Sequence, residues 1–328
     1  MEYNINTLID LYKIFSPSRN ERKIKKFIRR YCANIPGISV KTDPAGNIYA
    51  TKGIADNYPV ICSHLDQVQR SHSKDFDVIN HNGVLLGYSN NNKRQEGLGA
   101  DDKNGVFVCL ECLRILDTVK CAFFVGEEIG CYGSEKADIE FFQNARFIIE
   151  ADRRNAGDLI TDICGPVCSD DFLTAILPIC YKYGYKTEYG LMTDIKALLN
   201  NGVNVSCINV SCGYYHPHTD EEITVLSELC NCLDFILEIV NTITGVFPFS
   251  RYGGNSDYYD DAAYYCDEDC DTMNDILKQH PYYTFEDIKN WYKDCFICQD
   301  DDILNDIFND CNPDINREFW RMQKTFQN

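Results

Sequence analysis

The sequence is short of positive charge, because 31 Lys and Arg residues stand against 50 Asp and Glu residues in a chain of 328. The net charge of −19 argues against nucleic-acid binding, since the phosphate backbone requires a basic protein surface. No run of 18 apolar residues occurs, so we expect no membrane span. The start, Met1-Glu2-Tyr3-Asn4, has no basic region followed by an apolar stretch, and we expect no secretory signal. These absences predict a cytoplasmic protein.

Cysteine is plentiful, with 18 residues, but its distribution does not indicate a disulfide framework. Disulfide-rich domains are short, whereas this chain is long and 45% apolar, enough to bury a full core. Cys62, Cys109, Cys112 and Cys207 lie within apolar runs. We therefore expect most of the cysteines to be buried thiols.

Five short polar clusters lie mostly just after apolar, strand-like segments. They occupy residues 64–66, 99–105, 126–130, 150–152 and 215–219. Their side chains are largely His, Asp and Glu, the ligand set that suits zinc and similar divalent ions. The pattern predicts a two-metal hydrolase.

Three of these clusters suit particular chemical roles. In His64-Leu65-Asp66 the two-residue period of a strand points His64 and Asp66 to one face, where the carboxylate can orient a metal-bound imidazole. Asp101, with two free oxygens, is the candidate to bridge two cations about 3.5–4 Å apart. Adjacent side chains diverge, so one of Glu127 and Glu128 can bind a metal while the other acts as general base.

The order His-x-Asp, Gly-x-Asp-Asp-Lys-x-Gly, Gly-Glu-Glu-x-Gly, Asp and His resembles the peptidase T-like branch of the di-zinc exopeptidases and deacylases. The similarity covers roughly residues 1–245 and includes the segments 43–48 and 51–53. It implies a metal-dependent exopeptidase with a cis peptide bond between Asp101 and Asp102.

The same resemblance implies a role for each polar residue of the clusters. It implies that His64 and Asp152 bind one metal, that Glu128 and a late histidine bind the other, that Asp101 bridges them, and that Glu127 is the base. We expect a pair of divalent ions in each chain, with zinc as the first choice and cobalt or manganese as alternatives.

The late histidine has two candidates, His216 and His218. In related enzymes the last ligand is followed by Ser or Thr and, four positions on, by an acidic residue before an apolar helix. His218 meets this pattern with Thr219 and Glu222, whereas His216 is followed by Pro217 and meets it only in part. We therefore expect His218 to be the ligand and His216 to be a pocket residue or a partner of the ligands.

The chain order predicts an α/β protein with a mixed, largely parallel central sheet flanked by helices, as in zinc exopeptidases. Expected helices cover residues 21–31, 106–116, 172–184 and 194–200, and expected strands cover 38–42, 47–52, 59–63 and 121–125. A hairpin is expected from Phe76 to Tyr88, with Asn82-Gly83 as its turn. Residues 1–250 are expected to form the catalytic domain.

A lid and dimerisation domain, which members of this branch often carry, has no room in this chain. Only 65 residues separate Asp152 from His218, and they must complete the sheet and its helices, whereas an extra domain needs about 100 residues. We expect no lid-mediated dimer, and the oligomeric state stays open. Residues 66–100, with the polar loop 89–94, are the remaining candidate for a small cover over the site.

The C-terminal region differs from the rest, since residues 251–328 contain 18 acidic and 7 basic side chains. We expect an acidic linker over residues 251–271, followed by a helical extension with helices at 284–297 and from 302. A structural zinc on Cys266, Cys270, Cys295 and Cys298 is an alternative. Residues 300–302 lack the glycine and spacing of a calcium loop.

The other polar and aromatic residues near the clusters have simpler interpretations. His72, His81 and His280 lie in polar segments without a partner motif and are expected at the surface. Thr193 is expected to cap a helix N-terminus. For Tyr214 and Tyr215 a place in the substrate pocket and one in the core are both open.

Three classes of function agree with these features. The first is an aminopeptidase that acts on short peptides, in which one metal can also anchor the free amine. The second is a deacylase of N-acyl amino acids, because the same metal chemistry serves any amide bond. The third is a catalytically silent binding relative, which a lost base or ligand would indicate. A two-metal phosphoesterase is disfavoured, because only Lys103 and Arg153 are placed to receive a phosphate.

Overall fold

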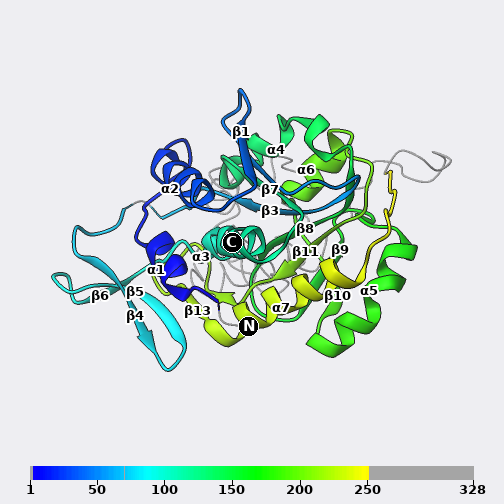
Figure 1. Ribbon diagram of the computed structural model, residues 1–328. Helices are drawn as coiled ribbons and strands as arrows, with labels where there is room; N and C mark the ends of the chain where they lie inside the picture. The colour runs from blue at the N-terminus through cyan, green and yellow to red at the C-terminus, as the bar shows by residue number, and fades with distance from the viewer. Residues whose placement is uncertain (1–2, 70, 251–328) are drawn as a thin grey trace, which may run out of the picture. The chain divides into compact units, whose positions relative to one another are not determined.

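Eight strands form the central sheet, in the order β1-β2-β7-β3-β8-β11-β9-β10 (Figure 1). Their bounds are β1 Ile38–Thr42, β2 Ile48–Lys52, β3 Tyr58–His64, β7 Val119–Phe124, β8 Ala145–Arg153, β9 Asp158–Asp162, β10 Lys186–Tyr189 and β11 Cys207–Ser211. The neighbours β7, β3, β8 and β11 pair in parallel, whereas β1, β2 and β9 pair antiparallel. The expected mixed, largely parallel sheet is confirmed.

This computed structural model describes residues 3–69 and 71–250. The described residues up to Glu188 and from Met192 onward belong to one compact unit. The expected acidic linker and helical extension, His280, and the four cysteines proposed as a zinc site lie outside the described residues. In the part of the chain that is described, no helix has the length and apolar character that crossing a bilayer requires.

Helices cover both faces of the central sheet (Figure 1). On one face lie α1 Ile5–Tyr12, α2 Arg22–Ala33, α3 Ala100–Ile115, α5 Asp170–Tyr183 and α7 Leu226–Thr242, and on the other lie the short α4 Tyr132–Glu135 and α6 Asp194–Asn200. Side chains alternate between two cores, because successive residues of a strand point to opposite faces. In β3, Ile61 packs in the core with α3, while Val60 and Cys62 pack in the core with α6.

A second, antiparallel sheet lies beside the first and carries part of the polar clusters. It contains β4 Phe76–His81, β5 Val84–Ser89, β6 Arg94–Glu96, β12 Tyr214–Tyr215 and β13 Ile223–Val225, with β13 between β12 and β5. The hairpin between β4 and β5 is confirmed, and its turn residues Asn82 and Gly83 have φ values of 53° and 87°. β13 pairs with β5 through residues 223–225 and 84–86, and the loop before β13 contacts Gln95 and Gly97.

The interval between Asp152 and His218 is taken up by β9, α5, β10, α6, β11 and β12. It therefore completes the two sheets and their helices, as expected, and leaves no separate lid domain in this part of the chain.

The cysteines also agree with the expectation of buried thiols. Cys62, Cys109, Cys112 and Cys207 are free thiols and are buried.

Candidate metal centre

The polar clusters meet where three neighbouring parallel strands end. His64 is the last residue of β3, Asp152 lies near the end of β8, and Glu127 begins the 3-10 turn η1 Glu127–Ile129 that follows β7. Gly126 and Gly130 flank this turn with φ values of 66° and 92°, a left-handed conformation that glycine adopts without strain. The strand order thus places three sequence-predicted residues at one edge of the sheet.

Asp101 lies between the two histidines of the site. Its Oδ1 is 3.0 Å from His64 Nε2, and its Oδ2 is 3.2 Å from His218 Nε2. Asp101 lies at the start of α3, and the bond that joins it to Asp102 is a cis peptide, as the resemblance implied. One carboxylate therefore faces the ring nitrogens of two separate histidines, which is the arrangement expected of a bridging group.

Each histidine has a second carboxylate beside it. Asp152 Oδ1 lies 3.4 Å from His64 Nε2, and Glu128 Oε2 lies 3.1 Å from His218 Nε2. The sets His64-Asp101-Asp152 and Asp101-Glu128-His218 each offer three ligand atoms within 4.8 Å of one another and share Asp101. A third set, His64-Glu127-Glu128, meets the same criterion. Each set could hold one cation.

Among the described residues, the buried Glu128 Oε1 has no hydrogen-bond partner, and the buried Asp152 Oδ1 has only His64 Nε2 nearby, 3.4 Å away and outside hydrogen-bonding geometry. A buried polar atom without a partner is costly, and a bound cation would supply the missing interaction. The donors are imidazole and carboxylate, which suit zinc. These residues therefore fit a metal pair.

Asp66 connects His64 with the loop that carries Glu127. Its Oδ1 lies 3.5 Å from His64 Nδ1 and accepts a hydrogen bond from the Glu127 N–H at 3.0 Å, while Ser18 Oγ donates to Oδ2 at 2.7 Å. Asp102 holds the main chain of His64, because its Oδ2 accepts the His64 N–H at 3.1 Å. Asp66 lies where the sequence placed it, and sequence reasoning missed Asp102 and Ser18.

In the metal-free protein, burial and neighbouring charges raise the pKa values of several groups of the site. Burial raises the pKa of Asp152 to about 8, with help from the carboxylates of Asp101 and Glu128. Burial alone would lower the pKa of His64, but the neighbouring carboxylates, with Asp152 first, outweigh it and raise that pKa well above its usual value. The pKa of His218 is raised in the same way by Glu128 and Asp101.

Metal binding is therefore expected to release protons at pH 7. Because the raised pKa values of Asp152, His64 and His218 keep protons within the site at pH 7 and metal ligands must be deprotonated, metal binding displaces protons, and metal affinity should rise with pH. Titration calorimetry in buffers of different ionisation enthalpy measures this release. A binding heat that is the same in all buffers would contradict the expectation.

Sequence reasoning also missed a buried acidic group beside the centre. Glu150, two residues before Asp152 on β8, accepts a hydrogen bond from Thr193 Oγ1, and Asp194 accepts one from Ser134 Oγ at 2.5 Å. Thr193 occupies the helix N-cap position as expected, but its hydroxyl serves Glu150 instead of capping. The sequence did hold a signal for Glu150, because residues two apart in a strand point to the same face and Glu150 precedes Asp152 by two.

The expected surface position is confirmed for His81, which is exposed, and is met only in part by His72, which is half-buried. The His72 ring stacks on Phe76 with centroids 3.9 Å apart, and its Nε2 lies 2.9 Å from the carbonyl oxygen of Gly97. Burial lowers the pKa of His72 to about 4. Gly97 lies 25 residues after His72 in the chain, so the polar local sequence concealed this contact.

The two tyrosines before the late histidines differ in environment. Tyr214 packs in the core and donates from its hydroxyl to the carbonyl oxygen of Asp152 at 3.1 Å. Tyr215 is half-buried and donates to Glu228 Oε2 at 2.8 Å. Tyr214 is thus a core residue that also supports the strand end bearing Asp152.

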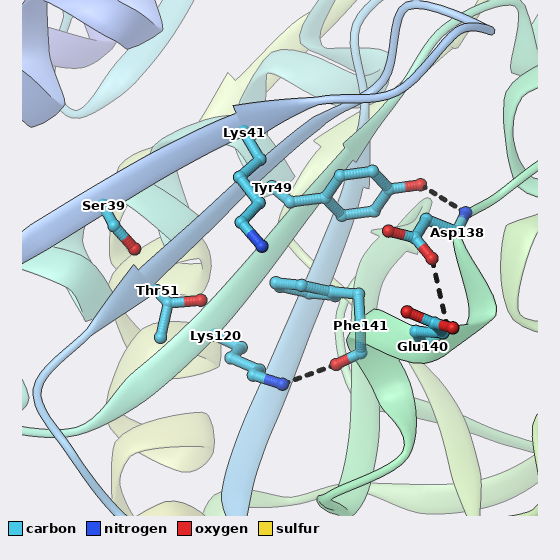
Figure 2. Close-up of a pocket in the computed structure, with 8 residues that line it drawn as sticks. All are labelled: Ser39, Lys41, Tyr49, Thr51, Lys120, Asp138, Glu140 and Phe141. Carbon is cyan, nitrogen blue, oxygen red and sulfur yellow. Dashed lines mark hydrogen bonds between the residues drawn. The ribbon is translucent and has the colours of Figure 1, made fainter.

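A pocket of about 230 Å³ lies elsewhere, on β1, β2 and β7 and the turn η2 Ile139–Phe142 (Figure 2). None of the residues of the candidate metal centre lines it. The ammonium group of Lys120 donates to the carbonyl oxygen of Phe141 at 2.6 Å (Figure 2) and to Asn144 Oδ1 at 2.5 Å. Asp138 and Glu140 contribute acidic side chains to the same rim, so the pocket is not a built anion site.

The sequence profile of peptidase family M28 matches residues 47–280, which include every residue of the centre, and the chain belongs to this family. Its peptidases depend on metal, and the chain is accordingly a metallopeptidase with candidate metal-binding groups at the strand ends. The comparison with curated proteins gave no match.

Solved structures of peptidases share the fold. Aminopeptidase PepT from Bacillus cereus ATCC 10987 matches with a TM-score of 0.62 and 15% identity, over 73% of this chain and 97% of that one. A tripeptidase from Staphylococcus aureus matches with a TM-score of 0.59 and 16% identity, over 72% and 96%. An aminopeptidase from the archaeon Desulfurococcus kamchatkensis matches with a TM-score of 0.56 and 14% identity, over 74% and 95%. The expected likeness to the catalytic core of di-zinc exopeptidases is confirmed.

Proposed function

We propose that the chain is a co-catalytic two-metal aminopeptidase that acts on short peptides. The observation that carries the proposal is the position of Asp101, whose two oxygens lie 3.0 Å and 3.2 Å from two different histidines. In this proposal His64 and Asp152 hold one ion, Glu128 and His218 hold the other, and Asp101 bridges the pair. The ions are zinc, or cobalt or manganese in its place.

Glu127 is the general base of the proposed reaction. Bound divalent ions supply Lewis acidity toward the scissile carbonyl and lower the pKa of an attacking water to about 7. Glu127 takes the proton of that water and delivers it to the leaving amine. In the metal-free protein, burial raises the pKa of Glu127 well above its usual value. Asp66 keeps Glu127 in place through the hydrogen bond from its N–H.

A deacylase of N-acyl amino acids is the second candidate, because hydrolysis of any amide uses the same groups. A catalytically silent binding relative is a weaker alternative, since the base and every proposed ligand are present and brought together. We also keep the expectations of a cytoplasmic location and of no lid-mediated dimer.

Metal analysis of the purified full-length protein, combined with a matched substrate screen, tests the proposal. We expect bound metal in a ratio of two ions to one chain, loss of activity with a chelator, and recovery with Zn²⁺, Co²⁺ or Mn²⁺. A tripeptide with a free amino terminus should be cleaved, whereas the same tripeptide with an acetylated amino terminus should not. Preference for N-acyl amino acids would favour the deacylase, and metal-loaded protein inactive on all three substrate types would favour the silent relative.

A further inference from the structure

Glu222 is a buried carboxylate that binds the main chain beside Asp101. It lies at the end of the loop that carries His218, directly before β13. Its Oε1 accepts the Asp101 N–H at 3.1 Å, and its Oε2 accepts the Gly99 N–H at 2.5 Å. Gln69 Nε2 donates to Oε2 at 3.1 Å. Both oxygens therefore accept hydrogen bonds from the main chain at the start of α3, and Oε2 also accepts one from Gln69.

The two segments are also packed together at other points. Gln95 Nε2 donates to the carbonyl oxygen of Glu222 at 3.3 Å, and the Gly97 N–H donates to Asp220 Oδ1 at 3.4 Å. A Cβ atom on Gly97 would lie 2.5 Å from the carbonyl oxygen of Thr219, so the approach leaves no space for a side chain there. Residues 95–101 and 219–222 thus form a close contact, with the Glu222 carboxylate at its buried end.

We propose that Glu222 is a positioning residue that fixes the separation of Asp101 and His218. This inference rests on the proposed function. The Glu222 carboxylate accepts a hydrogen bond from the N–H of Asp101, and Glu222 lies four positions after His218 in a short loop. Only a carboxylate offers an acceptor oxygen to each of the two N–H groups, because an amide side chain has one oxygen. The contact of both carboxylate oxygens thereby fixes the main-chain positions from which the side chains of Asp101 and His218 extend.

If the side chain at position 222 only filled space in the core, a glutamate would not be needed there. A buried charge costs more than an apolar side chain of similar size unless it is hydrogen-bonded, so simple filling of this place would favour a neutral residue. Groups that orient metal ligands typically change metal affinity or activity about 10–100-fold when they are replaced. We expect a change of this size for Glu222.

The test compares Glu222→Gln with Glu96→Gln in the full-length protein. Glu96 is a matched control, because it is also buried and accepts a main-chain N–H, that of Ser73 at 2.8 Å, but it does not bond residues 99–101. Zn²⁺ affinity, the visible spectrum of the Co²⁺-loaded protein and kcat are measured for both variants. Glu222→Gln should weaken metal binding about 10–100-fold and alter the Co²⁺ spectrum, whereas Glu96→Gln should leave both as in the unmodified protein.

A second variant covers the case in which Glu222→Gln does not fold. Glu222→Asp keeps the charge but is one carbon shorter, so it cannot reach both N–H groups, and we expect a smaller shift of affinity and spectrum in the same direction. Wild-type affinity and spectrum in either folded Glu222 variant, or an equal loss in Glu96→Gln, would overturn the inference. If the unmodified protein itself fails to bind two ions, the proposed function fails and this inference fails with it.

Discussion

Replacement of Glu127 by Gln is expected to reduce peptide turnover about 10²–10⁴-fold while both metal ions stay bound, because the base moves protons without holding a cation. The position of Glu127 supports this division. Its Oε2 lies 3.9 Å from His64 Nε2, farther than the oxygens of Asp101 and Asp152, and its N–H is held by Asp66. Gln keeps the shape of the side chain but cannot accept the proton.

Glu128→Gln is the matched comparison, because its carboxylate lies 3.1 Å from His218 Nε2 and is proposed to bind an ion. This variant should lose one ion and activity together. Metal content from elemental analysis, measured alongside turnover for both variants, separates the two roles. Equal metal loss in both variants would mean that Glu127 is also a ligand, as the set His64-Glu127-Glu128 allows.

Local patterns were enough to predict much of the fold. The helix expected at residues 194–200 has these bounds, and the Asn82-Gly83 turn forms as its two positive φ values require. The helix expected from residue 106 begins at Ala100 instead, although Asp101 and Asp102 have non-helical backbone angles, and its polar first turn is buried. Polar residues used by the site thus concealed the start of α3.

Long-range pairing was beyond the reach of local patterns. The segment after Glu222 was expected to enter a helix directly, but β13 comes first and pairs with β5, more than 130 residues earlier in the chain. Periodicity does not reveal which distant strands pair, so only the β4–β5 hairpin of the second sheet was predicted. The contacts that this sheet provides, those of Glu222 and His72 among them, were missed for the same reason.

The ligand clusters were easier to predict than their supporting residues. His64, Asp101 and Glu128 stand in short motifs whose order along the chain is informative, and the structure brings them together with Asp152 and His218. Asp102 and Glu150 stand in the same clusters, but they act through a main-chain contact and a hydroxyl contact that the sequence does not reveal. An acidic residue in an acidic chain carries little information until its neighbours are known.

His218→Ala is expected to remove one of the two ions and to lower turnover by about 10²-fold or more. A bound ion contributes several kcal/mol to the transition state, and each 1.36 kcal/mol is a factor of ten in rate. His218 Nε2 lies 3.2 Å from Asp101 Oδ2 and 3.1 Å from Glu128 Oε2. Its side chain is 49% exposed, so removal should leave the fold intact and affect chiefly the ion.

His216→Ala is the control within the same loop. His216 is also exposed and also has a positive φ, 55° against 65° for His218, yet it belongs to none of the metal-ligand sets of the described residues. Because the two histidines are alike in exposure and backbone, only their distance from Asp101 and Glu128 separates the expected outcomes. His216→Ala should keep both ions and most of the activity. If His216→Ala loses an ion while His218→Ala retains both, the ligand is His216, and the loop must adopt another arrangement when metal binds.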